Sequence, residues 1–206
     1  MSSNFAHNDR KIHEVKARPA VEKTLRAAFT EKGVNIARIT WTDEKHSNGL
    51  LFEKAGIDGA IYLFGGGRLT FQAKALTHWE AKWGTLTVEY YNDPATKLEG
   101  DWFTCIAQIY ICGYVLEDYS GMRPWAVVNY PALKMATVQG RVQWSVNGNT
   151  KSRARANFKY VEIDKLPEDV LIARLNPKPE PLLLPARVPS SVPDVLAPPE
   201  PKDKVA

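Results

Sequence analysis

Two strand-like segments joined by three glycines constrain the fold more than any other feature of this chain. The segments are GIDGAIYLF and RLTFQAKAL, and Gly65, Gly66 and Gly67 lie between them. Both alternate in polarity and are rich in β-branched or aromatic residues, which is typical of strands. Glycines between two such segments favour a tight reversal of the chain. The pattern predicts an antiparallel hairpin, and a hairpin needs further strands or helices against it to be stable.

The hairpin is expected to gather polar side chains on one face. With a turn centred on Gly66, Asp58 would lie opposite Lys74, and Ala60 opposite Gln72. A change in the turn would alter this register, but alternation alone keeps Gln72 and Lys74 together. The other face would be apolar, with Ile57, Ile61, Leu63, Leu69, Phe71 and Ala73.

An acid, an amide and a lysine on one face are suitable equipment for a divalent-metal site. Mg²⁺ prefers a few oxygen ligands and keeps several waters, so a carboxylate, an amide oxygen and a backbone carbonyl suit it. Lys74 would then orient or deprotonate a water, or neutralise developing charge. The ordinary alternative is that Asp58, Gln72 and Lys74 are solvated residues of a surface strand.

The segment GIDGAIYLFGGGRLTFQAKA resembles the core hairpin of the PD-(D/E)XK nuclease superfamily, where an Asp is followed after a turn by (D/E/Q)-X-K. The resemblance implies that Asp58, Gln72 and Lys74 are catalytic and that Asp58 and Gln72 bind Mg²⁺ or Mn²⁺. It also implies that Glu22, on the first helix, joins the metal site; Glu14 is the competing acid. Later segments follow a similar order, so the resemblance covers residues 14–175.

The remaining patterns predict an α/β (α+β) fold with a central mixed sheet flanked by helices, and the resemblance implies a restriction-endonuclease-like core. Helical spacing predicts a first helix over residues 18–32, with Pro19 in its opening turn. A second helix is expected in PALKMATVQ and a short helical stretch in LPEDVLIARL. The other apolar segments read as strands.

The chain of 206 residues is long enough for one core. We expect a flexible N-terminus at 1–13, one nuclease-like domain at 14–175 and a disordered Pro-rich tail at 176–206. Nine of the 14 prolines follow Asn176, and proline sustains neither helices nor sheet ladders. Such a tail serves as a linker or as a ligand for a protein partner.

Cysteine usage and the absence of a long apolar segment suggest an intracellular protein. Cys105 and Cys112 have neither zinc-site nor secreted-disulfide spacing, so buried free thiols in a reducing compartment are expected. No segment has the length of a signal peptide or a membrane span. We therefore predict a soluble cytoplasmic protein without membrane contact, including the case of a phage protein acting in its host. The sequence leaves open whether the protein forms a homodimer.

One basic segment is a candidate contact for nucleic acid, the partner that the resemblance implies. Lys151, Arg153 and Arg155 alternate onto one face of a strand-like segment, where they would contact phosphates; an edge strand that uses charge against pairing is the alternative. Together with these residues, the resemblance to the PD-(D/E)XK superfamily implies a metal-dependent DNA nuclease, an endonuclease rather than an exonuclease. The competing prediction is a catalytically inactive nuclease-fold protein that binds nucleic acid or a protein partner.

Overall fold

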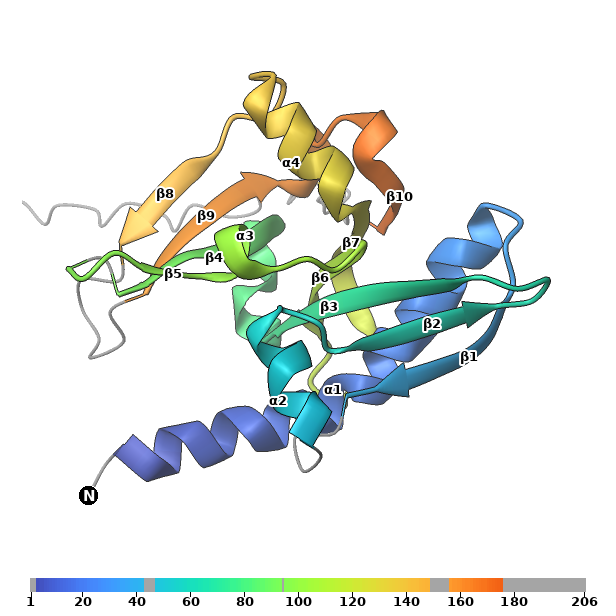
Figure 1. Ribbon diagram of the computed structural model, residues 1–206, viewed down its shortest axis with the longest axis horizontal. Coiled ribbons are helices and arrows are strands. Elements are labelled where there is room, and N and C mark those ends of the chain that lie inside the picture. Colours follow the sequence, from blue (N-terminus) through green and yellow to red (C-terminus); the bar gives the residue numbers. More distant parts are fainter. Residues whose placement is uncertain (1–2, 43–46, 94, 149–155, 176–206) are drawn as a thin grey trace, which may run out of the picture.

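The computed structural model describes residues 3–42, 47–93, 95–148 and 156–175 (Figure 1). The predicted basic residues Lys151, Arg153 and Arg155 and the Pro-rich tail lie outside these described residues. The fold is α+β, with a central mixed sheet of six strands, as the sequence predicts.

The helices of the described part are α1 (Ser3–Glu31), α2 (Ser47–Lys54), α3 (Asp101–Thr104), α4 (Tyr130–Val138) and the 3-10 helices η1 (His78–Trp83), η2 (Ile163–Lys165) and η3 (Glu168–Val170). The strands are β1 (Ile36–Trp41), β2 (Gly59–Leu63), β3 (Arg68–Leu76), β4 (Thr85–Asp93), β5 (Leu98–Glu99), β6 (Ile109–Val115), β7 (Met122–Asn129), β8 (Ser145–Gly148), β9 (Asn157–Glu162) and β10 (Leu171–Leu175).

The central sheet has the strand order β1-β2-β3-β6-β7-β10. β3 and β6 are parallel, and the other neighbours are antiparallel. Parallel neighbours need a long crossover connection, and here that connection contains η1, β4, β5 and α3. The crossover therefore brings residues from outside the hairpin to the face of β3.

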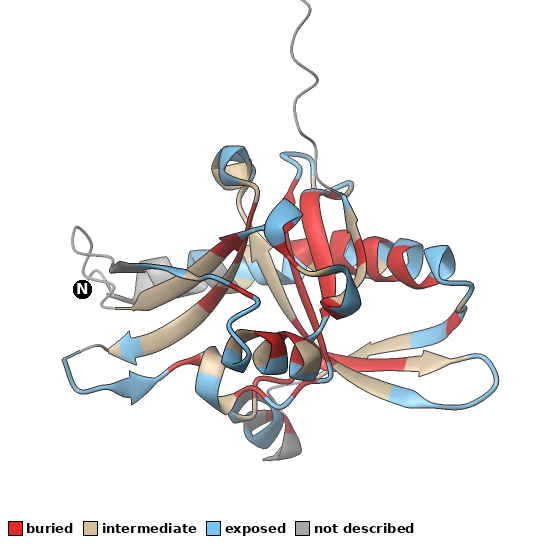
Figure 2. Cartoon of the chain, turned by 90° about the horizontal axis from the view of Figure 1, so that it is seen from above, coloured by how far each residue is buried: buried red, intermediate tan, exposed pale blue. Residues whose placement is uncertain are grey.

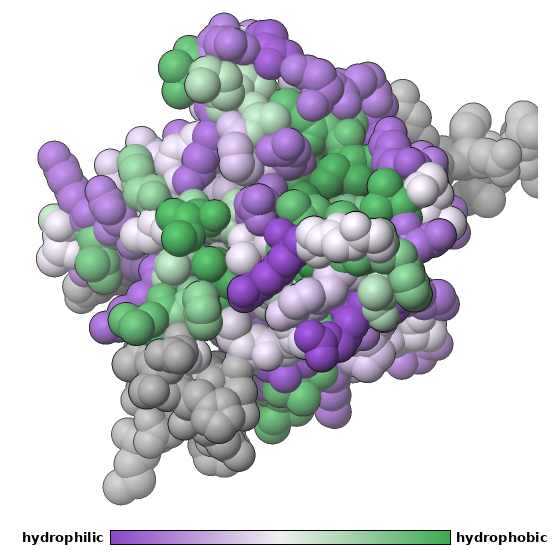
Figure 3. Space-filling view, turned by 45° about the vertical axis from the view of Figure 1, so that its right-hand side comes forward, coloured by the Kyte–Doolittle hydropathy of each residue, from purple (hydrophilic) through white to green (hydrophobic). Residues whose placement is uncertain are grey.

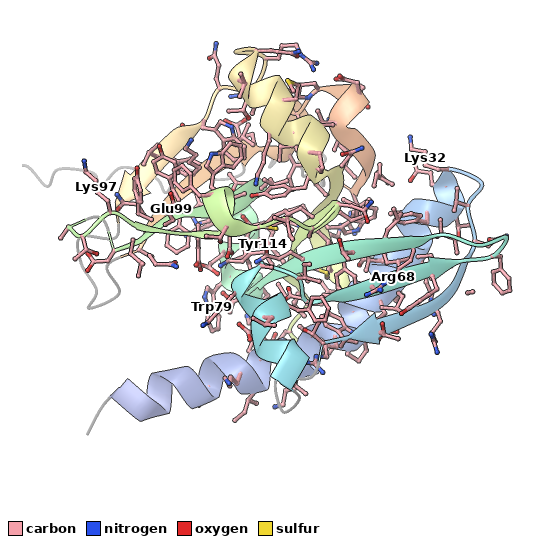
Figure 4. All side chains as sticks on the ribbon, in the orientation of Figure 1. Lys32, Arg68, Trp79, Lys97, Glu99 and Tyr114 are labelled. Carbon is pink, nitrogen blue, oxygen red and sulfur yellow. The ribbon has the colours of Figure 1, made fainter. Side chains whose placement is uncertain are left out.

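A second sheet, β5-β4-β9-β8, lies against one face of the central sheet, where the sequence analysis expected helices (Figure 1). Side chains of β6 satisfy backbone groups of β4. The Tyr110 hydroxyl donates to the Thr87 carbonyl (2.7 Å) and the Tyr114 hydroxyl to the Thr85 carbonyl (3.1 Å). Tyr114 accordingly lies in the middle of the molecule in Figure 4. These bonds fix β4 relative to the central sheet, since buried backbone groups need partners.

Helix α1 covers the opposite face of the sheet. It begins at Ser3, well before the predicted start at Arg18, so the boundary predicted at Glu14 falls inside the helix. Pro19 lies within α1, and its predicted place in the opening turn was wrong. Figure 1 shows the helix changing direction along its length. A proline inside a helix removes a hydrogen bond and is a common cause of such a bend.

Two apolar cores result, one on each face of the central sheet. The core under α1 includes Leu25, Ile61 and Phe71, and the core between the sheets includes Leu86 and Tyr110. Figure 2 shows that the buried residues are concentrated in the central strands and that the tip of the β2–β3 hairpin is exposed. On the face in Figure 3, hydrophilic residues interrupt the hydrophobic surface.

The segment LPEDVLIARL differs from its prediction, because it forms η3 and the edge strand β10 instead of a helix. Pairing with β7 overrides its helical composition: Ala173 pairs with Val127 and is buried. Cys105 and Cys112 are free and buried, as predicted. In the described part of the chain, no helix has the length and apolar character to cross a membrane.

Candidate functional site

The β2–β3 hairpin forms as predicted, but its register differs. Tyr62 pairs with Arg68 and Gly59 with Phe71, so the turn is centred on Gly65 and Asp58 is level with Gln72. The predicted pairing of Asp58 with Lys74 was wrong, as was that of Ala60, which pairs with Thr70. The difference is an even number of residues, so the side chains within β2 and β3 keep their predicted faces. Ile57, which precedes β2, was predicted on the face of Ile61 and Phe71 but lies in the core between the sheets.

Asp58 is fixed immediately before β2 begins. Its backbone nitrogen donates to the Phe71 carbonyl (2.9 Å), and its Oδ2 accepts a hydrogen bond from the Ala73 nitrogen (2.7 Å). The Asp58 carboxylate thus accepts the hydrogen bond of the Ala73 N–H. If β2 began earlier in the chain, this N–H would instead pair with a backbone carbonyl of β2. This bond holds Asp58 beside the Gln72–Ala73–Lys74 segment.

Gln72 points into the molecule and has an unsatisfied oxygen. The residue is only 9% exposed, and its Oε1 has no hydrogen-bond partner among the described residues. Gly56 borders this oxygen: a Cβ at Gly56 would lie 2.7 Å from Gln72 Oε1 and 2.7 Å from Cys105 Cβ. Gly56 also has a φ of 62°, so this position requires glycine for both space and conformation.

Lys74 has a partner, Glu89, that the sequence pattern did not predict. Its Nζ lies 2.6 Å from Glu89 Oε1, and the two side chains are 15% and 13% exposed. Lys74 Nζ also lies 5.5 Å from the centre of the Phe158 ring. Glu89 and Phe158 are paired neighbours on β4 and β9. The second sheet therefore holds the ammonium of Lys74.

The structure distinguishes the two candidate acids of α1, Glu22 and Glu14. Glu22 Oε1 accepts from Trp41 Nε1 (2.9 Å), and Trp41 packs in the core under α1, so Glu22 is engaged on the face away from Gln72. His13 Nε2 lies 3.1 Å from the Ala75 carbonyl, at the end of β3 that extends beyond β2. Glu14 follows His13, and it is the α1 acid whose charge acts on Asp58.

The pKa of Asp58 is raised to about 6 from its ordinary value of 3.8. Desolvation by burial is the main cause, and the negative charges of Asp101 and Glu14 raise the pKa further. The hydrogen bond from Ala73 and the charge of Lys74 lower it. A carboxyl group desolvated beside other acids is a typical feature of functional sites.

Two acids at this site, Glu89 and Asp101, were not predicted from the sequence. Both are contributed by the crossover between β3 and β6, in TVEYYND and EGDWF. The only signal in the sequence was an acid in the middle of a strand and an acid opening a helix, and such residues are common on protein surfaces.

The described residues contain no group of three or more His, Cys, Asp and Glu side chains arranged to hold a metal ion. A cation here would therefore also depend on the Gln72 amide and on backbone oxygens. A depression of about 400 Å³, lined by Arg26, Thr30, Asn35, Ile36 and Phe64, shares no residue with this site.

Comparisons with known proteins assign no family to the chain. No protein-family model matches it. No curated protein matches it, and no solved structure does.

Proposed function

We propose that this protein is a metal-dependent nuclease that hydrolyses phosphodiester bonds in DNA. One observation carries the proposal: the Ala73 nitrogen fixes the Asp58 carboxylate next to Gln72, whose buried Oε1 has no partner among the described residues. Lys74 follows on the same strand face and is held by Glu89. The resemblance of this hairpin to the PD-(D/E)XK motif adds support.

The donor set suits a hard divalent cation. Asp58 offers a carboxylate and Gln72 an amide oxygen, and Mg²⁺ and Mn²⁺ prefer oxygen ligands. A buried acceptor without a donor costs about 1–3 kcal/mol, and a bound cation would satisfy Gln72 Oε1. When bound, Mg²⁺ or Mn²⁺ would polarise the phosphoryl group and lower the pKa of a bound water.

Lys74 is suited to stabilising charge in the reaction. Lys74 is the next residue after Gln72 whose side chain lies on the same face of β3. The 2.6 Å contact between its Nζ and Glu89 Oε1 restricts the position of the ammonium. A preorganised cation facing the phosphate stabilises the charge that develops on the phosphoryl oxygens. Glu89 would act as a positioning residue for Lys74. Glu22 is engaged by Trp41 on the other face of the sheet, and Glu14 is the α1 acid whose charge raises the pKa of Asp58.

Nucleic acid as the substrate is supported by an aromatic cluster beside the site. Tyr90, Tyr91 and Phe103 form this aromatic ledge, with ring centres 4.5, 5.0 and 5.5 Å apart. Phe103 is 39% exposed and belongs to α3, as does Asp101. Lys159 Nζ lies 4.0 Å from the centre of the Tyr90 ring. One exposed ring, two partly exposed rings and a lysine are suited to unpaired bases and their phosphates.

Replacing Phe103 by Ala is expected to weaken the binding of single-stranded DNA, because a stacked base contributes about 1–3 kcal/mol. That range corresponds to roughly a 5- to 150-fold rise in Kd, measured by fluorescence anisotropy in EDTA. Phe64→Ala is the matched control, since Phe64 is 72% exposed at the hairpin tip. Equal effects of both substitutions would contradict a role for the ledge.

The alternative is a nuclease-fold protein that binds nucleic acid or a protein partner without cutting. The Lys74–Glu89 ion pair favours this alternative, because it satisfies the lysine within the protein. Gln72 also supplies less negative charge than an acid would.

Incubation of the protein with linear, nicked, branched and single-stranded DNA decides between the two functions. We expect cleavage in Mg²⁺ or Mn²⁺ and none in EDTA. Binding without cleavage in either metal would establish the alternative.

A further inference from the structure

Three side chains form a row across the outer strands of the central sheet. Arg38 on β1 pairs with Tyr62 on β2, and Tyr62 pairs with Arg68 on β3. Directly paired residues of antiparallel strands share a face of the sheet. The guanidinium carbon of Arg38 lies 4.5 Å from the centre of the Tyr62 ring, and that of Arg68 lies 5.9 Å from it. These three residues, the arginine row, bring two positive charges to one ring.

The two guanidinium groups of the arginine row keep their charge available to solvent. Both arginines are exposed, and neither forms an ion pair or a hydrogen bond with a residue that the structure describes. Arg174, in contrast, pairs with Glu168 at 2.6 Å. An aromatic ring holds a guanidinium in place without neutralising it. The row is therefore suited to binding an anion.

The arginine row lies on the face of the sheet that carries the candidate site. Residues at even spacing along a strand share a face, so Arg68 lies on the same face of β3 as Gln72 and Lys74. The core under α1 occupies the opposite face. Arg68 and Gln72 are four residues apart, which is about 13 Å along an extended strand.

The strands offer a path between the row and the site. Thr40, Ala60 and Thr70 pair across β1, β2 and β3 in the intervening positions, and all three are small. The strand segments Ile36–Trp41, Gly59–Leu63 and Arg68–Leu76 contain no acidic residue. Figure 1 shows the β2–β3 hairpin projecting away from the second sheet, and Figure 4 labels Arg68 on it. An extended polyanion could therefore cross these strands without meeting an acid.

We infer that the arginine row binds the sugar-phosphate backbone of the DNA whose scissile phosphate lies at Asp58 and Lys74. The inference rests on the proposed function, because that proposal places the reaction there. One strand of a duplex carries a phosphate every 3.4 Å or so of helix axis, so a separation of about 13 Å corresponds to about four phosphates. The row holds the DNA at this distance from the scissile bond and orients it.

Protection of a sheet edge does not account for the whole row. Charged residues on an edge strand discourage pairing with another chain, and β1 is an edge strand of the central sheet. Arg68, however, belongs to β3, which lies between β2 and β6. A phosphate contact explains both arginines, because they flank the same ring on the same face.

The salt dependence of DNA binding by the full chain tests the inference. Binding of duplex DNA is measured by fluorescence anisotropy in EDTA at several salt concentrations. Each phosphate contact contributes about 0.9 to the slope of log K against log salt, so Arg38→Gln/Arg68→Gln should make this slope less steep by about 1.8. Arg38→Lys/Arg68→Lys keeps both charges and should keep most of the slope.

The control for net charge is Arg123→Gln/Arg141→Gln, which removes two positive charges from exposed positions outside β1, β2 and β3. This variant should keep the wild-type slope. Cleavage by Arg38→Gln/Arg68→Gln at saturating DNA should stay near the wild-type rate, because the row binds DNA away from the scissile bond.

A wild-type slope in Arg38→Gln/Arg68→Gln, or an equal loss of slope in the control, would overturn the inference. Loss of cleavage at saturating DNA would overturn it too, because the row would then act on the fold or the chemistry. The slope is measured without metal, so it is separate from the proposed function. A chain that shows the expected slopes but cuts no DNA in Mg²⁺ or Mn²⁺ fails the proposed function and keeps the row as a DNA contact.

Discussion

Asp58→Ala is expected to reduce metal-dependent DNA cleavage to the level seen in EDTA, and to weaken Mn²⁺ binding in the same protein. The physical reason is that Asp58 offers the carboxylate fixed closest to Gln72, through its 2.7 Å hydrogen bond from Ala73. Cleavage is measured on labelled DNA and metal affinity by calorimetry. Asp118→Ala controls for the loss of an acid at an exposed turn. Unchanged cleavage by Asp58→Ala would remove Asp58 from the active site.

Removal of Lys74 should slow cleavage without weakening Mn²⁺ binding, whereas removal of Asp58 should reduce both. Without its ammonium, cleavage should slow by roughly 10²–10⁴-fold, while Mn²⁺ still binds, because Lys74 is not a ligand. Lys74→Ala alone leaves Glu89 partly buried without its partner, which destabilises the fold. The Lys74→Ala/Glu89→Gln double variant avoids this.

The matched control for the double variant is Lys165→Ala/Glu162→Gln, which removes an exposed ion pair of similar length (2.7 Å). If the Lys74 double variant cleaves DNA at the wild-type rate, Lys74 and Glu89 form a structural ion pair. Loss of both cleavage and Mn²⁺ binding would instead mean that Lys74 affects the metal site itself.

The sequence predicted the hairpin and the two faces of its strands, because alternation depends only on neighbouring residues; Ile57 breaks the alternation because it precedes β2 and lies in the other core. It placed Gln72 and Lys74 together correctly. The register was not predictable, since three consecutive glycines allow several turn geometries, and the observed turn also includes Leu63 and Phe64. Asp58 therefore lies level with Gln72 instead of Lys74.

The residues that contact or influence Asp58 and Lys74 could not be predicted from patterns of neighbouring residues. Glu89 and Asp101 belong to the crossover between β3 and β6. Part of this crossover forms the second sheet, which the sequence pattern did not predict. Glu22 and Glu14 lie on one helix, and only the path of α1 across the sheet shows that Glu14 acts on Asp58. Contacts between distant segments depend on topology, which periodicity does not contain.

Asp58→Asn is expected to stabilise the metal-free protein at pH 7.5 but not at pH 4. The folded pKa of Asp58, about 6, lies above its ordinary value of 3.8. The folded state therefore favours the protonated carboxyl, and the stability linked to this group falls as the pH rises from about 4 through about 6. Asparagine stays neutral and still offers an oxygen to the Ala73 nitrogen, so it escapes this loss. A shift of about two pKa units corresponds to at most about 3 kcal/mol, or roughly 6–12 °C in Tm.

Thermal melting in EDTA across this pH range measures the effect. Asp118→Asn is the control of opposite sign, because hydrogen bonds from Ser120 lower the pKa of Asp118. Its substitution should give no gain at pH 7.5. A gain from Asp58→Asn that is the same at pH 4 and pH 7.5 would mean that desolvation of the charge is not its cause.

Mn²⁺ should reverse the order of stabilities at pH 7.5. A cation that binds only the folded wild type stabilises it by about 4.1 kcal/mol at a concentration of 1,000 times its Kd, which exceeds the loss of at most about 3 kcal/mol, whereas Asp58→Asn lacks the charged ligand and should gain little. The same side chain would then cost stability without metal and provide it with metal. That combination is the expected behaviour of a binding site, since a purely structural carboxylate would lose stability on substitution in both conditions. If Asp58→Asn is less stable than the wild type in EDTA and in Mn²⁺ alike, Asp58 is a structural residue.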